Sequence, residues 1–204
     1  MKIKEIKTWF RDAGGYLTTN NLLQRGVHTS TIKMLLQKNE IVQVKRGLYR
    51  LPADELPEDE KFTHDYFDVA RAVSDGVFCL STALFYHNMT TTRPVVFDVA
   101  IPRSHRSTKI STVSVHYYRF SEPYYSMNIE RISTNIAPVR MYDLEKTVCD
   151  AIRLRHIVGE DIAMEGLNTY MRRRNKKINK LLKIAARCKV RHIVEPGVKA
   201  MVGF

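Results

Sequence analysis

The sequence has few cysteines and no long apolar run, and each absence narrows the class of protein. Its three cysteines, Cys79, Cys149 and Cys188, are widely spaced and form no Cys-x-x-Cys pair. We therefore expect buried free thiols rather than a zinc site or a disulfide framework. No apolar run approaches the roughly 20 residues of a membrane span, and the N-terminus lacks the apolar core of a signal peptide. These absences predict a cytoplasmic protein without a membrane partner.

Motifs of catalysis are also missing. The sequence has no Gly-rich phosphate-binding loop, no nucleophile elbow and no pair of histidines at metal-ligand spacing. Four acidic residues keep a metal-dependent nuclease open as an alternative: Asp98, Asp143, Glu145 and Asp150. No Glu-x-Lys motif accompanies Asp98, however, and helix capping with an internal ion pair explains these residues better. We expect no catalytic residue, no metal and no cofactor.

Positive charge is what the sequence has in excess. The chain has 204 residues, a net charge of +12 and a pI of about 9.7, which favours a polyanionic partner such as nucleic acid or an anionic membrane surface. Residues 1–52 carry a net charge of +7, residues 53–150 carry −4 and residues 151–204 carry +9. The two basic ends are therefore where we expect contacts with a polyanion.

The first fifty residues show the periodicity of a short helical module. Ile3, Ile6, Trp9 and Phe10 recur at helical spacing, and a glycine pair at 14–15 ends that helix. Thr18 or Thr19 is a suitable N-cap for a second helix, which Gly26 ends. A third helix is predicted to start at Thr29, Ser30 and Thr31, which are all good capping residues.

The third helix carries the candidate base-reading residues. Ile32, Leu35 and Leu36 mark its buried stripe, whereas Lys33 and Gln37 lie four residues apart on another face. In a helix-turn-helix this element enters the major groove, where Gln pairs with adenine and Lys with guanine. Thr29 and Ser30 stand where phosphate contacts are common, and Thr31 is a further candidate for contact with DNA. An ordinary solvated helix face is the alternative interpretation.

A basic hairpin follows the third helix and favours the DNA-binding interpretation. Residues 41–44 are rich in β-branched side chains, and residues 48–51 form a returning strand. Between them Lys45 and Arg46 precede Gly47, at a turn that requires positive φ. The order of three helices and a hairpin predicts a winged helix-turn-helix over residues 1–52, with Lys45 and Arg46 at the wing tip.

The rest of the chain predicts a mixed α/β domain. Residues 53–62 form an acidic linker punctuated by proline, and residues 63–204 form the second domain, with a basic helical tail from about residue 161. Strands are expected at 95–101, 112–120 and 135–141, and helices are expected to begin near Ser81 and Asp143. A second basic run gives further candidate DNA contacts: Arg172, Arg173, Arg174, Lys176 and Lys177. Overall the sequence predicts a mixed α/β (α+β) fold.

Several short motifs resemble the AbiEi-type antitoxins. The stretch from Gly26 to Arg50 is similar to the N-terminal domain of that family. Downstream, Ser81 to Leu84 resembles its Ser-x-Ala-Leu helix, residues 99–103 resemble its strand ending in Pro-Arg, and residues 144–150 resemble its Leu-Glu-Arg-Thr-x-x-Asp segment. Lys146 stands where the family often has Arg, and the last fifty residues are the least matched.

The resemblance implies an antitoxin of a type IV toxin–antitoxin system. Such a protein binds double-stranded operator DNA, represses its own operon and counteracts a nucleotidyltransferase-like toxin, with no need for a stable complex between the two proteins. Two alternatives stay open from the residues alone. One is a winged-helix transcriptional regulator without a toxin partner, and the other is a DNA-targeted nuclease.

Overall fold

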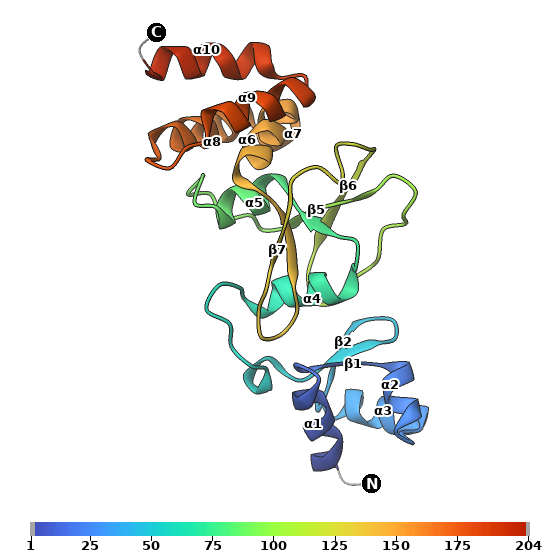
Figure 1. Cartoon of the computed structure of the whole chain (residues 1–204). Coiled ribbons are helices and arrows are strands. Elements are labelled where there is room, and N and C mark those ends of the chain that lie inside the picture. Colours follow the sequence, from blue (N-terminus) through green and yellow to red (C-terminus); the bar gives the residue numbers. More distant parts are fainter. Residues whose placement is uncertain (1–2, 203–204) are drawn as a thin grey trace. The chain divides into compact units, whose positions relative to one another are not determined.

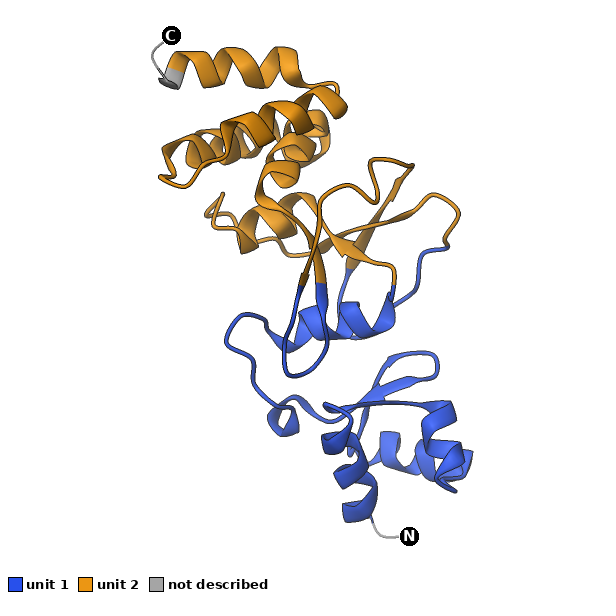
Figure 2. Ribbon diagram, in the orientation of Figure 1, with its two compact units in different colours: residues 1–74, 106–114, 132–139 blue, residues 75–105, 115–131, 140–204 orange. Residues whose placement is uncertain are grey.

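The chain folds into two compact units, which Figure 2 colours separately. The computed structural model describes residues 3–202. Unit 1 comprises residues 1–74, 106–114 and 132–139, and unit 2 comprises residues 75–105, 115–131 and 140–204. Both helices and strands are abundant (Figure 1). The expected α+β class is therefore confirmed.

Unit 1 begins with a three-helix module and a small antiparallel sheet. Its strands are ordered β1-β3-β2, so that Tyr16 on β1 and Val42 on β2 both pair with Arg50 on β3. In chain order the elements of this unit are α1 (Ile3–Asp12), β1 (Tyr16–Thr18), α2 (Thr19–Gln24), α3 (Thr29–Gln37), β2 (Val42–Lys45), β3 (Leu48–Arg50), a short 3-10 helix (Ala53–Glu55) and α4 (His64–Ala72).

Local sequence signals explain where these helices start and stop. Helix α1 buries Ile6 and Phe10 and ends before Gly14, whose φ is +69°. Thr18, one of the two expected N-caps of helix α2, precedes its first residue and forms a reciprocal capping box with Asn21. The expected capping of α3 by a threonine or serine is wrong. His28 is its N-cap, without a side-chain hydrogen bond, and Thr29 is already helical.

Segments from later in the sequence complete unit 1. Ser111 donates its backbone N–H to the Val44 carbonyl at 2.7 Å, and so occupies the outer edge of β2. Arg71 on α4 donates to the Ile136 carbonyl. The expected linker, residues 53–62, contains the 3-10 helix and buries Leu56 and Phe62. That residues 1–52 fold as a domain on their own stays a prediction.

Unit 2 is built around a mixed five-stranded sheet with the strand order β6-β5-β4-β8-β7. Strand β4 is antiparallel to β5 and parallel to β8, and β5 is parallel to β6. Helix α5 (Leu80–Tyr86) connects β4 to β5 and contacts β5. The strands are β4 (Val77–Phe78), β5 (Phe97–Pro102), β6 (Val115–Phe120), β7 (Ile129–Ile132) and β8 (Val139–Tyr142).

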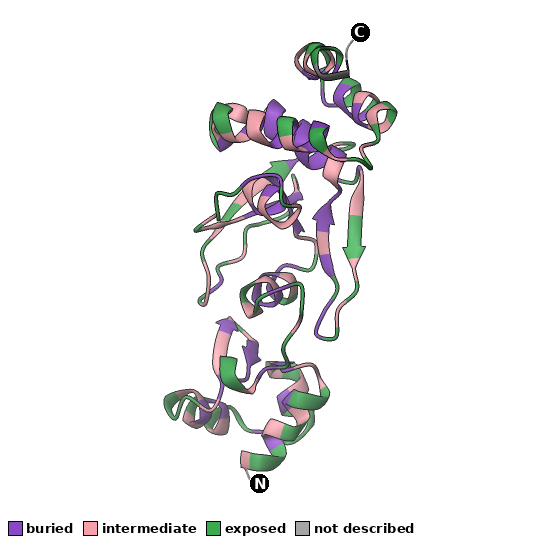
Figure 3. Ribbon diagram, turned by 90° about the vertical axis from the view of Figure 1, so that its left-hand side faces the viewer, coloured by how far each residue is buried: buried purple, intermediate pink, exposed green. Residues whose placement is uncertain are grey.

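Helix α6 is the centre of the hydrophobic core of unit 2. It packs against α5, α8 and α9, and every residue from Glu145 to Ile152 is buried. Figure 3 colours the ribbon by burial and shows buried, purple stretches in both helices and strands. Asp143 caps α6 by accepting from the Lys146 N–H at 2.8 Å, as expected. The helices of this region are α6 (Leu144–Arg153), α7 (Arg155–Val158), α8 (Glu160–Arg172), α9 (Ile178–Arg187) and α10 (Arg191–Val202).

Other local expectations for unit 2 had mixed outcomes. The three cysteines are free and buried, which confirms that prediction. The expectation that Ser81 caps a helix is wrong, because Cys79 is the N-cap of α5 and Ser81 lies inside the helix. The strand expected at 135–141 starts later, at Val139. Within the described residues, no helix is both long and apolar enough to cross a bilayer.

Candidate nucleic-acid interface

Helix α3 has one buried face and one exposed face, as a DNA-reading helix requires. Ile32 and Leu35 are 3% and 1% exposed, so they anchor the helix in the core of unit 1. Lys33 and Gln37 are exposed and one helical turn apart, so they lie on the same outer face. Thr29 and Ser30 are exposed at the N-terminus of the helix, and Thr31 is half-buried.

The turn between α2 and α3 fixes the orientation of the two helices relative to each other. Gly26 has a φ of +78°, a conformation that glycine adopts without steric cost. Val27 follows it, is 1% exposed and donates its N–H to the Leu22 carbonyl at 3.0 Å. The tight turn and the buried valine hold α2 and α3 in a fixed pair, which is what a helix-turn-helix needs to present one helix to a groove.

The hairpin between β2 and β3 places the two predicted wing cations in different environments. Arg46 is exposed at the turn, next to Gly47 with a φ of +79°. Lys45 is half-buried, and its Nζ donates to the Ala72 carbonyl at the end of α4 at 2.6 Å. Arg46 is therefore the exposed cation of the turn, whereas Lys45 connects the hairpin to the end of α4 through its hydrogen bond.

A buried ion pair ties the hairpin to α4. Asp68 on α4 is fully buried, and Arg50 on β3 donates to its carboxylate at 3.1 Å. Tyr16 on β1 donates its hydroxyl proton to the other carboxylate oxygen at 2.8 Å. Burial raises the pKa of Tyr16, and the charge of Asp68 raises it further, so the phenol stays protonated. Three elements thus converge on a single carboxylate, which sequence periodicity did not reveal.

Some basic residues of α1 are occupied within the protein. Lys7 contacts Glu40 at 2.5 Å and Glu55 at 2.6 Å, and Arg11 contacts Glu55 at 2.8 Å. Burial alone would lower the pKa of Lys7, but its hydrogen bonds to Glu40 and Glu55 outweigh burial and raise it. The positive charge of Lys7 is largely balanced by these carboxylates. The exposed cations of α3 and the hairpin are therefore the better candidates for phosphate contacts.

The second basic run connects two helices. Arg172 ends α8, Lys177 caps α9, and both are exposed, as is Arg174. Arg173 is half-buried and donates to the His87 carbonyl, and Lys176 donates to the Arg173 carbonyl at 3.3 Å. The structure thus divides the five candidates into three exposed cations and two that stabilise the loop.

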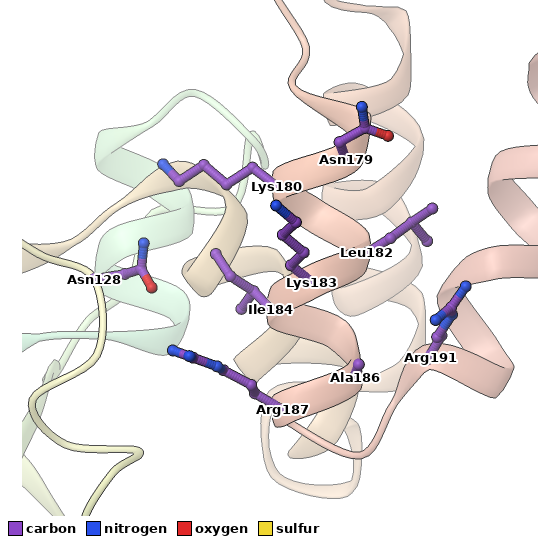
Figure 4. Close-up of a pocket in the computed structure, with 9 residues that line it drawn as sticks. All are labelled: Asn128, Asn179, Lys180, Leu182, Lys183, Ile184, Ala186, Arg187 and Arg191. Carbon is purple, nitrogen blue, oxygen red and sulfur yellow. The ribbon is translucent and has the colours of Figure 1, made fainter.

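A basic concavity follows this run along α9 (Figure 4). It measures about 670 Å³, and Lys180, Lys183 and Arg187 project from α9 around it. Lys180 contacts Asp143 and Glu145, each at 2.7 Å, whereas Lys183 is exposed. Ten basic and no acidic residues occur between positions 166 and 194. Lys183 and Arg187 were not among the candidate DNA contacts predicted from the sequence. The absence of acidic residues between positions 166 and 194 could have indicated them.

The acidic residues that left a nuclease open are engaged in structural contacts. Asp143 and Glu145 share Lys180, and Asp150 contacts Lys146 and Arg153 at the centre of unit 2. Lys146 is fully buried, with its Nζ 4.2 Å from the ring centroid of Tyr142. Within residues 3–202, no group of three histidine, cysteine or acidic residues is arranged to hold a metal ion.

The architecture of α1 to β3 defines a winged helix-turn-helix, a module found in transcriptional regulators. Residues 4–52 match the family described as transcriptional regulator, AbiEi antitoxin. The match spans this module and ends where the 3-10 helix follows, so it does not extend to α4 or unit 2. No curated protein matches the chain.

Proposed function

We propose that the chain is an antitoxin that binds operator DNA and represses its own operon. The observation that carries the proposal is the exposed pair Lys33 and Gln37 on α3, beside a hairpin with exposed Arg46, in a module that matches AbiEi regulators. In this proposal α3 lies in the major groove, where Gln37 reads adenine and Lys33 reads guanine. Thr29, Ser30 and Arg46 bind phosphates and fix the register.

The exposed cations of unit 2 are proposed as a second, sequence-independent contact. Arg172, Arg174 and Lys177 lie between α8 and α9, and Lys183 extends the basic surface along α9. The segment 172–177 contains no aromatic residue that could stack on unpaired bases. Contact with the backbone of duplex DNA therefore fits the chemistry of these cations better than binding of single-stranded DNA. Arg173, Lys176 and Lys45, which have internal partners, are proposed to act by holding the loop and the hairpin.

A mobility-shift assay with the DNA upstream of the chain's own gene tests operator binding. The variant Lys33→Ala/Arg46→Ala is expected to lose at least about tenfold in affinity, because it removes one base contact and one phosphate contact worth about 1 kcal/mol or more each. The matched control Lys61→Ala/Lys109→Ala removes the same charge from exposed positions outside α3 and the hairpin. Equal affinity of the two variants, or no preference for the upstream DNA over unrelated duplex, would reject the proposal.

The antitoxic activity is proposed on the same family match and needs its own test. We propose that the partner is a nucleotidyltransferase-like toxin encoded beside this chain, and that both proteins act in the cytoplasm without a stable complex. Co-expression with the adjacent gene from an unrelated promoter is expected to restore growth. Growth that stays arrested, or the absence of a toxic neighbour, would favour a regulator without a toxin partner.

The proposed function is non-enzymatic. Of the carboxylates that a nuclease would use, Asp143 caps α6 and contacts Lys180. Asp150 pairs with Lys146, and Asp98 accepts a hydrogen bond from α5. Incubation of the protein with DNA and Mg²⁺ or Mn²⁺ is expected to leave the DNA intact. Cleavage that Asp98→Ala abolishes would overturn this part of the proposal.

A further inference from the structure

A second cavity in unit 2 lies apart from the basic residues proposed to bind DNA. It measures about 400 Å³, which is within the size range of small-molecule sites. Its walls come from the start of α5, the loop before β5, the strands β5 and β6, and the α7–α8 region. All of these segments belong to unit 2. The cavity is therefore defined without reference to unit 1.

One wall of the cavity carries a buried carboxylate. The Asp98 side chain is 8% exposed, and it accepts hydrogen bonds from the Ser81 N–H at 3.0 Å and the Tyr118 hydroxyl at 3.1 Å. The Ser81 side chain also bonds to this carboxylate, which has about four acceptor positions and can therefore accept a further hydrogen bond. Burial raises the pKa of Asp98, and the hydrogen bonds from Tyr118 and Ser81 offset this rise only in part.

Asp98 differs from the other buried carboxylates of the described chain. Asp68 pairs with Arg50, Asp150 pairs with Lys146, and Asp143 and Glu145 share Lys180. Asp98 has no lysine or arginine partner within the described residues, and its nearest cationic group is the exposed His116, at 3.8 Å. Aspartate and glutamate are rarely fully buried unless they are paired. The side chain that lacks such a pair is the one that lines a cavity.

Two exposed apolar side chains line the cavity. Val95 is 96% exposed and Ile157 is 50% exposed, and both line the cavity together with Ile162. Within the described residues only Leu23 is a further exposed large hydrophobic side chain. Thr92, Arg93 and His116 also line the cavity, and all three are exposed, so that solvent screens the charge of Arg93. The cavity therefore combines a buried carboxylate with two exposed apolar side chains.

We propose that this cavity binds a small organic cation, with an ammonium or amidinium group on Asp98 and an apolar body against Val95 and Ile157. The cation would donate to the carboxylate oxygens, which already accept from Ser81 and Tyr118. The apolar body would cover side chains that water otherwise contacts. The proposal goes beyond operator binding and does not depend on it.

Methyl NMR of the full chain without DNA tests the proposal. The probes are two cations, phenethylamine and benzamidine, and two anions with the same ring, phenylacetate and benzoate. At millimolar concentration the cations are expected to shift the methyl signals of Val95 and Ile157, and the anions are not. Equal shifts from cations and anions, or no shift from either cation, would overturn the proposal.

Two variants distinguish the contribution of the carboxylate to cation binding from that of the exposed apolar side chains. Asp98→Asn keeps an oxygen that can accept from Ser81 and is expected to weaken cation binding about tenfold or more. Because the Asp98 carboxylate also accepts from the Ser81 N–H of α5, a second variant is placed at an exposed position. Ile157→Lys is expected to weaken the cations severalfold and to favour the anions. Cation binding that survives both substitutions would contradict the assignment of the site.

Discussion

At the scale of single residues, Asp68 has the clearest structural role in unit 1. It accepts from Arg50 and Tyr16 in a fully buried position, so its removal would leave a buried guanidinium without its partner. Removing one member of a buried pair typically costs 3–5 kcal/mol. We expect Asp68→Ala to lower the free energy of unfolding by about 3 kcal/mol in urea denaturation.

Asp65 provides a matched control on the same helix. It is exposed in the first turn of α4, where a carboxylate contributes about 0.3–1 kcal/mol through the helix dipole. Asp65→Ala is therefore expected to cost less than about 1 kcal/mol. If Asp68→Ala costs no more than this control, the buried pair does not hold the hairpin to α4 in the way the geometry indicates.

His87 gives the protein a predictable response to mild acid. Its Nε2 lies 2.8 Å from the Tyr142 carbonyl oxygen, which can only accept, so Nε2 carries the proton of the neutral ring. Burial lowers the pKa of His87 below its ordinary value of 6.5. Between the lowered pKa and 6.5 the unfolded chain binds more protons than the folded chain, so the free energy of unfolding falls as the pH falls through that window.

Chemical denaturation between pH 7.5 and 5 tests this response. The wild-type protein is expected to lose stability over that range, and His87→Gln, which retains an N–H donor for the Tyr142 carbonyl, is expected to lose less. Exposed His156 provides the control, because His156→Gln removes a histidine that is in contact with water. An identical pH profile for wild type and His87→Gln would show that the buried ring does not set the response.

At the scale of elements, the hairpin assigns different roles to two adjacent cations. Lys45 donates to the Ala72 carbonyl, whereas Arg46 is exposed. A hydrogen bond from a charged group contributes about 1.5–3 kcal/mol, so Lys45→Met is expected to lower the free energy of unfolding by about that amount. Arg46→Ala is expected to change stability by no more than about 0.5 kcal/mol, but to weaken operator binding. Denaturation and fluorescence anisotropy with operator DNA distinguish the two, and the opposite assignment would contradict the proposed roles.

Elements defined by local signals could be predicted from the sequence, and those defined by distant partners could not. The periodicity of Ile6 and Phe10, the Thr18 cap and the Gly26 turn are local, and the structure has α1, α2 and α3 where they indicate. Strand β4 has only two residues, Val77 and Phe78, and exists because β5 and β8 pair with it. No periodicity can be read from two residues.

The candidate sites show the same division. The sequence identified Lys33, Gln37 and Arg46, and the structure places all three on the exposed surface of unit 1, although their contact with DNA remains a proposal. It could not reveal that Lys45 reaches the end of α4, because that contact joins residues 27 positions apart. For the same reason the partners of Asp98 and Asp68 became known only from the fold.

At the scale of the whole molecule, the charge distribution predicts how DNA binding depends on salt. Each phosphate contact adds about 0.9 to the slope of log affinity against log salt concentration. Arg172, Arg174 and Lys177 are the exposed cations between α8 and α9. If all three contact phosphates, replacing them together with glutamine reduces the slope by about 2.7 while the preference for operator over unrelated duplex is retained. The internally bonded Arg173 and Lys176 are left unchanged, so that the loop keeps its conformation.

The control for this experiment removes the same number of charges elsewhere. Lys61, Arg103 and Lys109 are exposed and lie outside the two basic ends of the sequence, so their replacement with glutamine is expected to leave the slope unchanged. Equal slopes for the two triple variants would show that the C-terminal cations do not contact DNA. A reduced slope for the first variant alone means that both basic ends bind the same polyanion, because the slope counts the ions released from that DNA and not the total charge of the protein.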